Sequence, residues 1–225
     1  MTSGTGHPRT GRVGAADRIA ALSGAASVVM TLTIGSIGDV GGKGLDPTMA
    51  PEALVDGLRE HAAAISTGAS FTALGAVLAV VFLGPLWNQL KRASEGLAVT
   101  GVAGGVLWAT QTLHFAAEGV GLASAADLGD GVAARSLMTA DYEVARLLAV
   151  PSLILVATAV VAGFRYDLFP RWFRWFSLAL SVPVVIAFTP LGPAGLMGAL
   201  GALWILTASV LFAFRPPGAP DPPAR

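Results

Sequence analysis

The sequence predicts an all-α fold: a polytopic membrane bundle of six transmembrane helices with both termini in the cytoplasm. Three observations predict it. Hydrophobic residues make up 54% of the chain and charged residues 12%, which is outside the usual range for soluble proteins. Long stretches contain no Asp, Glu, Lys or Arg, and basic residues gather on alternate connections between these stretches. The absence of cysteine excludes disulfides, thiolate metal sites and a cysteine nucleophile.

The charge-free stretches set the predicted spans, because crossing a hydrocarbon core of roughly 30 Å takes about 20 apolar helical residues. They are residues 19–38, 62–87, 97–117, 147–164 and 175–214. Each of the first four supplies one span. The last is twice that length and contains Pro190 and Pro193 near its middle, so we expect two spans joined by a tight turn.

The basic residues predict the orientation, because cytoplasmic loops of membrane proteins are enriched in Lys and Arg. One set of segments holds Arg9, Arg12, Arg18, Lys91, Arg92, Arg165, Arg171, Arg174, Arg215 and Arg225. The other set holds only Lys43, Arg59, Arg135 and Arg146. Both termini are therefore expected in the cytoplasm. The scarcity of Lys and the abundance of Ala and Gly are typical of a GC-rich bacterial genome, such as an actinobacterium's, so the predicted location is a bacterial plasma membrane.

The chain divides into a membrane domain and two tails. Residues 1–15 are expected to be a disordered cytoplasmic tail, 16–215 the six-helix domain, and 216–225 a proline-rich cytoplasmic tail. The first apolar stretch has the length of a full span and lacks a small-residue cleavage site, so it is interpreted as a retained helix and not as a secretory signal.

Two outer segments are long enough to cover a pocket that opens to the exterior. Residues 51–60 carry apolar side chains at helical spacing after a proline, which predicts a short amphipathic outer helix or an outward extension of the second span. The second segment covers residues 125–146. Its latter part, from Leu137 to Arg146, is expected to form a helix that leads into the fourth span. The cytoplasmic connections are too short to form a pocket.

The connection at residues 164–175 alternates aromatic and basic residues. Aromatic rings favour the headgroup level of a membrane, and guanidinium groups pair with lipid phosphates. We interpret this segment as a membrane anchor. Nucleic-acid binding is not predicted, because the segment is held at the membrane surface.

The order of elements resembles a family of bacterial six-helix membrane proteins that is catalogued as a domain of unknown function. The likeness covers most of residues 15–215. It rests on Arg18-Ile19-Ala20 at the start of the first span, a sizeable outer loop before the second, and Leu168-Phe169-Pro170-Arg171 before the fifth. The resemblance implies a fold and a location, but no activity and no catalytic residues.

Ionisable groups inside a membrane are costly and mark candidate functional sites. The third span contains Gln111, His114 and Glu118, whose spacings of three and four place them on one helical face, with Trp108 one turn earlier. Counted from Leu97 at 1.5 Å per residue, His114 lies about 25 Å along the helix and Glu118 about 31 Å. The cluster is therefore expected near the outer surface. Expected neighbours at this level are His61, Asp141 and Arg146.

Three interpretations of this cluster remain open. It can be a satisfied network in which Arg146 pairs with Glu118 or Asp141, the wall of a pocket for a small polar or amphipathic ligand, or a metal site that uses His61, His114 and Glu118. No catalytic residue is assigned, since the sequence contains no HExxH, P-loop or GxSxG motif.

The predicted function follows these interpretations. The protein is expected to bind or move a small or lipidic molecule through an outward-facing pocket. The alternatives are a structural or accessory membrane subunit without a ligand, and a metal-dependent membrane enzyme. The expected partners are the lipid bilayer and that ligand. No cofactor or resident metal is predicted, and the oligomeric state is left open.

Overall fold

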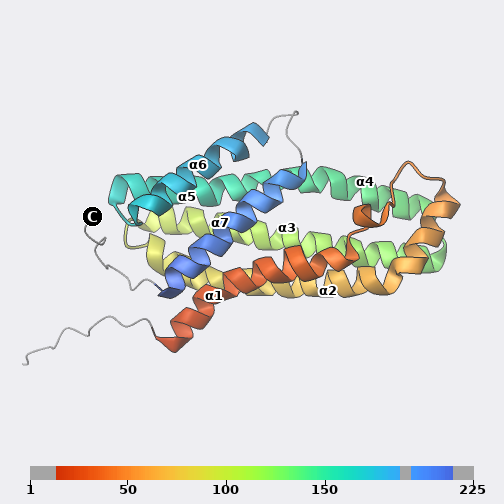
Figure 1. Ribbon diagram of the computed structural model, residues 1–225, viewed down its shortest axis with the longest axis horizontal. Coiled ribbons are helices and arrows are strands. Elements are labelled where there is room, and N and C mark those ends of the chain that lie inside the picture. The colour runs from red at the N-terminus through yellow and green to blue at the C-terminus, as the bar shows by residue number, and fades with distance from the viewer. Residues whose placement is uncertain (1–13, 188–193, 215–225) are drawn as a thin grey trace, which may run out of the picture.

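The described part of the chain, residues 14–187 and 194–214 of a computed structural model, consists of helices joined by short non-helical segments and contains no strand (Figure 1). The side chains of 142, 143, 145, 146, 187 and 194–197 lie outside the description. The α-helices are α1 (Ala15–Val29), α2 (Pro51–Leu90), α3 (Glu95–Leu128), α4 (Gly131–Leu147), α5 (Ala149–Tyr166), α6 (Arg171–Ala187) and α7 (Ala194–Phe214). Between α1 and α2 lie a π-helical segment, η1 (Met30–Ile34), and two 3-10 turns, η2 (Gly35–Gly38) and η3 (Gly41–Lys43). The all-α prediction is confirmed for these residues.

Three helical segments of the described part are long and apolar enough to cross a membrane. They are Ala15–Lys43, Pro51–Leu90 and Ala149–Tyr166, and a shorter apolar helix covers Gly198–Phe214. Helices also occupy the stretches predicted as the third and fifth spans. The tight turn expected around Pro190 and Pro193 lies outside the described residues, as do residues 1–13 and 216–225 of the two predicted tails, whereas Ala15 already belongs to α1. The number of six spans and their orientation stay predictions.

The helices α2 and α3 form a long antiparallel pair that runs along most of the molecule (Figure 1). They contain 40 and 34 residues, which corresponds to about 60 Å and about 51 Å of helix. Both exceed the roughly 30 Å of a hydrocarbon core. Residues 51–60 are the first turns of α2, so these residues extend the second predicted span, and the direction of the extension stays a prediction. The alternative prediction, a separate short amphipathic helix at this position, is wrong, because α2 continues without a break from Pro51 to Leu90.

The second predicted outer segment is also helical over most of its length. Helix α3 continues to Leu128 and ends at Gly129, whose φ of 72° is the left-handed conformation that glycine adopts without strain. Asp130 then caps α4, because its Oδ1 accepts the backbone N–H groups of Val132 and Ala133 at 3.1 and 2.9 Å. Leu148 joins α4 to α5. The prediction of a helix leading into the fourth span is confirmed.

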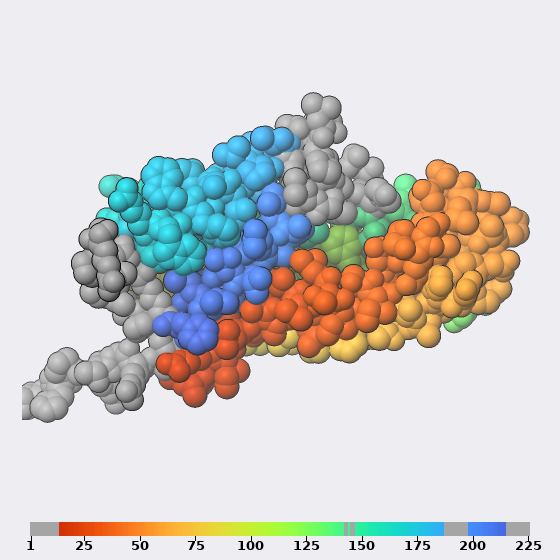
Figure 2. Space-filling model, in the orientation of Figure 1, coloured from red at the N-terminus to blue at the C-terminus, as the bar shows by residue number. Residues whose placement is uncertain are grey.

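Two separate hydrophobic cores follow from this arrangement. The first packs α1, α2, α3, α5, α6 and α7 around large side chains such as Phe82, Trp108, Phe173 and Trp204. The second joins the outer ends of α2 and α3 to α4 and to the segment before α2, around Leu54, Leu58, Leu122 and Met138. We call residues 39–65 and 119–147 the head and the remaining described helices the bundle. Figure 2 shows the N-terminal half of α2 forming much of the head's visible surface, at one end of the molecule.

The surface of the bundle is apolar along several helices. Large aliphatic side chains are exposed on α2, α3 and α6, namely Leu74, Val77, Val80, Val81, Val99, Val106, Leu107, Leu113, Val182, Val185 and Ile186. Monomeric soluble proteins rarely expose so much contiguous apolar surface. A lipid environment removes the cost of this exposure, in agreement with the predicted membrane location.

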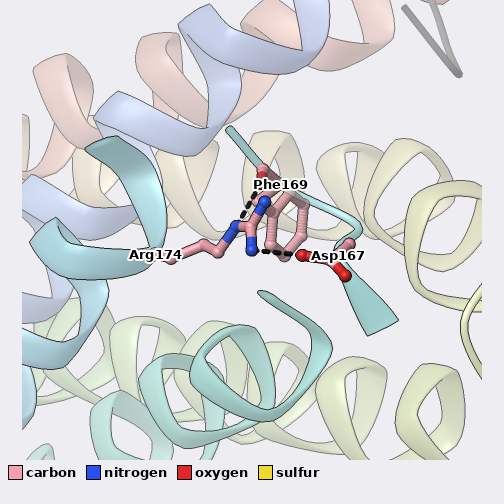
Figure 3. A network of polar contacts seen from close by, with 3 residues as sticks. All are labelled: Asp167, Phe169 and Arg174. Carbon is pink, nitrogen blue, oxygen red and sulfur yellow. Dashed lines mark hydrogen bonds and ion pairs between the residues drawn. The ribbon is translucent and has the colours of Figure 1, made fainter. Parts of the chain in front are cut away.

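The connections that carry most of the basic residues lie at the end of the molecule opposite the head. Figure 1 shows the start of α1, the α2–α3 and α5–α6 connections and the end of α7 at this end of the molecule. At the α5–α6 connection, the Arg174 guanidinium bonds the Asp167 carboxylate, and its Nε donates to the carbonyl of Phe169 at 2.6 Å (Figure 3). Trp172 and Trp175 are more than half exposed beside it. Exposed tryptophans next to arginines are typical of a membrane interface, which agrees with the predicted anchor.

Glycines allow the segment after α1 to contact the backbone of α2. A Cβ added at Gly68 would lie 2.6 Å from the carbonyl oxygen of Gly35 and 2.6 Å from the nitrogen of Gly38, so no larger residue fits without displacing backbone. This crossing lies where the bundle meets the head. It brings the end of the first apolar stretch against the middle of α2.

Candidate functional site

A pocket of about 150 Å³ lies at the junction of the bundle and the head. The glycine crossing of η2 and α2 forms one wall, with Gly35, Gly38 and Gly68. Helix α3 contributes a second wall, and α4 contributes Asp141. Because four segments from distant parts of the sequence meet here, the pocket exists only in the folded chain.

Glu118 is the central side chain of this pocket. It points inward from α3 and is 4% exposed. Its Oε1 lies 3.1 Å from Nε2 of His114, one turn earlier on the same helix. Its Oε2 has no hydrogen-bond donor among the described residues. A buried carboxyl oxygen without a donor is destabilising, so this atom is a natural place for a ligand.

Asp141 faces Glu118 from α4. The two carboxyl groups line the same small pocket and are close enough to interact electrostatically. Carboxylates are acceptors only, so such a contact is favourable only when a proton or another donor lies between them. Asp39, which also lines the pocket, adds a third acidic group close enough to interact electrostatically with Asp141. The ionisable groups among the described residues of the lining are therefore all acidic.

His114 lies at the rim of this site. Its side chain is 50% exposed and does not line the pocket, whereas Phe115 next to it does. Gln111 lies one turn further into the bundle, and its Oε1 is buried without a partner in the described part. The predicted polar face of the third span is therefore divided between a half-exposed histidine, a buried carboxyl group and a buried amide.

Of the other predicted site residues, His61 and Trp108 lie apart from the pocket lining. His61 is half-buried on α2, one turn before Ile65, which does line the pocket. Trp108 is buried in the core of the bundle, where a Cβ at Gly201 would lie 2.4 Å from its ring. The Arg146 side chain lies outside the described residues, so its pairing with a carboxylate stays a prediction.

The structure does not support a metal centre at the predicted position. The described residues contain no group of three or more His, Asp or Glu side chains placed to hold a metal ion. His61 is not gathered with His114 and Glu118, although the sequence places them at a similar depth.

Sequence reasoning missed the glycine wall and Asp39. Sequence analysis did not assign the glycines at the end of the first apolar stretch to the site, because nothing in their spacing shows which backbone they contact. Thr72 was also missed. It lines the pocket from α2, one turn from Gly68 and Ala69, and carries the one hydroxyl among the pocket's described side chains.

A second cavity lies on the outside of the bundle. This open groove of about 490 Å³ is lined mainly by apolar side chains of α7 and by Trp172. It lies on the apolar surface of the bundle, and its described lining has none of the converging ionisable groups that distinguish the inner pocket.

No family model, curated protein or solved structure matches this chain. The resemblance to a bacterial six-helix family stays a prediction. The functional argument therefore depends on the geometry of the pocket.

Proposed function

We propose that this chain is a six-span protein of a bacterial plasma membrane that binds a small molecule in an outward-facing pocket beneath its head. The apolar surface of the bundle and the gathering of the basic connections at the end away from the head support the membrane arrangement. With the basic end in the cytoplasm, the head projects outside. The pocket then lies near the outer surface of the membrane.

The observation that carries the proposal is the buried Glu118 carboxyl group, whose Oε2 faces the pocket without a donor. If the residue at position 118 served only to pack helices, an apolar side chain would make the fold at least as stable as Glu118 does. A volume of about 150 Å³ suits a molecule of a few non-hydrogen atoms. The pocket is too small for a lipid, so its ligand is a small solute. Lipids would contact only the outer surface of the bundle.

The proposal can be tested by asking whether water and small solutes reach the pocket. The chain contains no cysteine, so single cysteines can be introduced without a background signal. Thr72 lines the pocket, whereas Thr112 is a buried threonine of α3 that does not. Methanethiosulfonate reagents react with the thiolate, which forms only where water has access.

In purified full-length protein, Thr72→Cys should react with 2-hydroxyethyl methanethiosulfonate at least tenfold faster than Thr112→Cys. Mass spectrometry of the intact protein measures both rates. Equal, slow labelling of the two variants would show a sealed pocket and would favour the accessory-subunit alternative.

A further inference from the structure

We infer that the pocket binds a small organic cation, a primary ammonium group on a short alkyl chain, held between the Glu118 and Asp141 carboxylates. This inference rests on the proposed function and adds the chemical class of the ligand. It is based on the supply of hydrogen-bond donors, the charge of the lining and the shape of the cavity.

The described lining of the pocket has few hydrogen-bond donors for its carboxyl groups. Glu118 and Asp141 present carboxyl groups to each other, and Glu118 Oε2 has no donor in the described part of the chain. Among the described residues, Thr72 carries the one hydroxyl of the lining, and no Lys, Arg or His lines the pocket. The nearby Lys43 is exposed and donates to the carbonyl of Ile37 at 2.9 Å. An ammonium ligand supplies three N–H donors, enough for both carboxylates and one further acceptor.

The second step concerns charge. When both carboxyl groups are ionised they repel each other, and Asp39, which also lines the pocket, adds a further acidic group. An anionic ligand would increase this repulsion, and a neutral ligand would leave it unchanged. A cation between the carboxylates converts the repulsion into two favourable ion pairs in a place with little water.

The third step concerns the remaining walls, which are apolar. Ile65, Ala69, Phe115 and Leu122 complete the lining. A hydrated metal ion gains nothing from such walls, and divalent ions prefer six or more oxygen ligands. A short alkyl chain fits against the aliphatic side chains. The Phe115 ring can also attract the positive nitrogen through its π face.

His114 has a positioning role in this arrangement. Its Nε2 contacts Glu118 Oε1 at 3.1 Å, and this contact leaves Oε2 as the oxygen that is available to the ligand. The histidine approaches from the half-exposed side of α3, away from the pocket lining. It therefore orients the carboxyl group without occupying the space of the ligand.

Thermal unfolding of the full chain in detergent tests the ligand class. Propylammonium, propionate and propanol are compared at equal ionic strength. Propylammonium should raise the midpoint by roughly 2–4 °C at about five times its dissociation constant, and the other two should not. Glu118→Gln and Asp141→Asn should lose this shift. Asp127→Asn, which removes an exposed carboxylate of the head, should keep it.

A second measurement does not depend on the stability of these variants. In Thr72→Cys protein, 2-aminoethyl methanethiosulfonate should react roughly tenfold faster than the anionic 2-sulfonatoethyl reagent, because an acidic cleft concentrates cations. Adding Glu118→Gln should reduce this ratio, whereas adding Asp127→Asn should leave it unchanged.

The possible failures can be told apart. If Thr72→Cys is labelled by the neutral reagent but shows no preference for cations, and propylammonium shifts the midpoint no more than propionate does, the ligand class is wrong and the proposed pocket stands. If Thr72→Cys is not labelled at all, both proposals fail. A propylammonium shift that persists in Glu118→Gln would place the cation elsewhere and overturn the inference.

Discussion

His114 and Glu118 share one polar contact across the boundary between surface and interior. Nε2 of the histidine lies 3.1 Å from Oε1 of the carboxyl group, while the histidine side chain is half exposed and the glutamate side chain only 5% exposed. The two residues are four apart on α3, so the helix itself sets their spacing. The exposed residue thus brings a ring nitrogen within ion-pair distance of the buried carboxyl group.

We therefore expect His114→Ala to lower the free energy of unfolding by about 1–3 kcal/mol, because the second oxygen of a buried carboxyl group would lose its partner. Unfolding in mixed detergent, followed by circular dichroism, measures this change. His61→Ala is the matched control, since this half-buried histidine of α2 has no ion pair in the described part of the chain. Equal losses in the two variants would contradict the structural role of the contact.

The glycine crossing gives a sharper prediction. Gly68→Ala would place a methyl group 2.6 Å from the backbone of Gly35 and Gly38, and neither backbone can move without opening the pocket wall. Overpacking of this kind typically costs about 1–3 kcal/mol. Gly84→Ala, in the same helix, meets nothing within 4 Å and should be neutral or stabilising by up to about 1 kcal/mol. Thermal unfolding measures the stability of both variants. If Gly68→Ala is as stable as the unsubstituted protein, the close backbone contact of Gly68 with Gly35 and Gly38 is contradicted.

The sequence predicted the helices well, because apolar runs of a fixed minimum length have few alternatives in a membrane. It also predicted that the end of the third apolar stretch and the start of the fourth lie at one level, and Glu118 and Asp141 from these regions line the same pocket. That inference needed only helix rise and loop length. Both are local properties.

The head and the pocket walls could not be predicted in the same way. The helical pattern at 51–60 is equally compatible with a separate helix, and only its packing against Leu122 and Met138 shows that it continues α2 into a second core. The contact of Gly35 with Gly68 is likewise non-local. Spacing within one helix reports which residues share a face, but not which helix that face contacts.

Arg59 stabilises the head through the end of α3. Its Nη2 donates to the carbonyl of Ala126 at 2.8 Å, one of the last carbonyls of that helix. Arg59→Met should lower the stability of the head by about 1 kcal/mol, visible as faster amide hydrogen exchange over 120–128. Asp56→Asn removes only the exposed ion pair with Arg59, 3.6 Å long, and should change exchange little. If both substitutions raise amide exchange by similar amounts, the stabilisation comes from the ion pair and not from the hydrogen bond to Ala126.

The pairing of Arg146 with Glu118 stays a prediction that mutants can settle. If the pair exists, Arg146→Met should cost about 3–5 kcal/mol where burial is complete and less near the headgroups, because an unpaired carboxylate remains. Combining it with Glu118→Gln should recover part of this loss. Purely additive losses in the double-mutant cycle would show that no such pair forms. The carboxyl pair would then depend on the ligand for its donors.

The final prediction concerns orientation. Glu52 and Asp127 are exposed residues of the head, and neither is the capping Asp130, so cysteine at these positions preserves the start of α4. In intact cells, an impermeant maleimide should label Glu52→Cys and Asp127→Cys but not Ser3→Cys or Ala219→Cys, because the basic segments favour the cytoplasm. The terminal cysteines should become labelled once the cells are permeabilised, which controls for their reactivity. Labelling of Ser3→Cys or Ala219→Cys in intact cells would reverse the orientation. The acidic pocket would then lie at the cytoplasmic side, and its ligand would come from inside the cell.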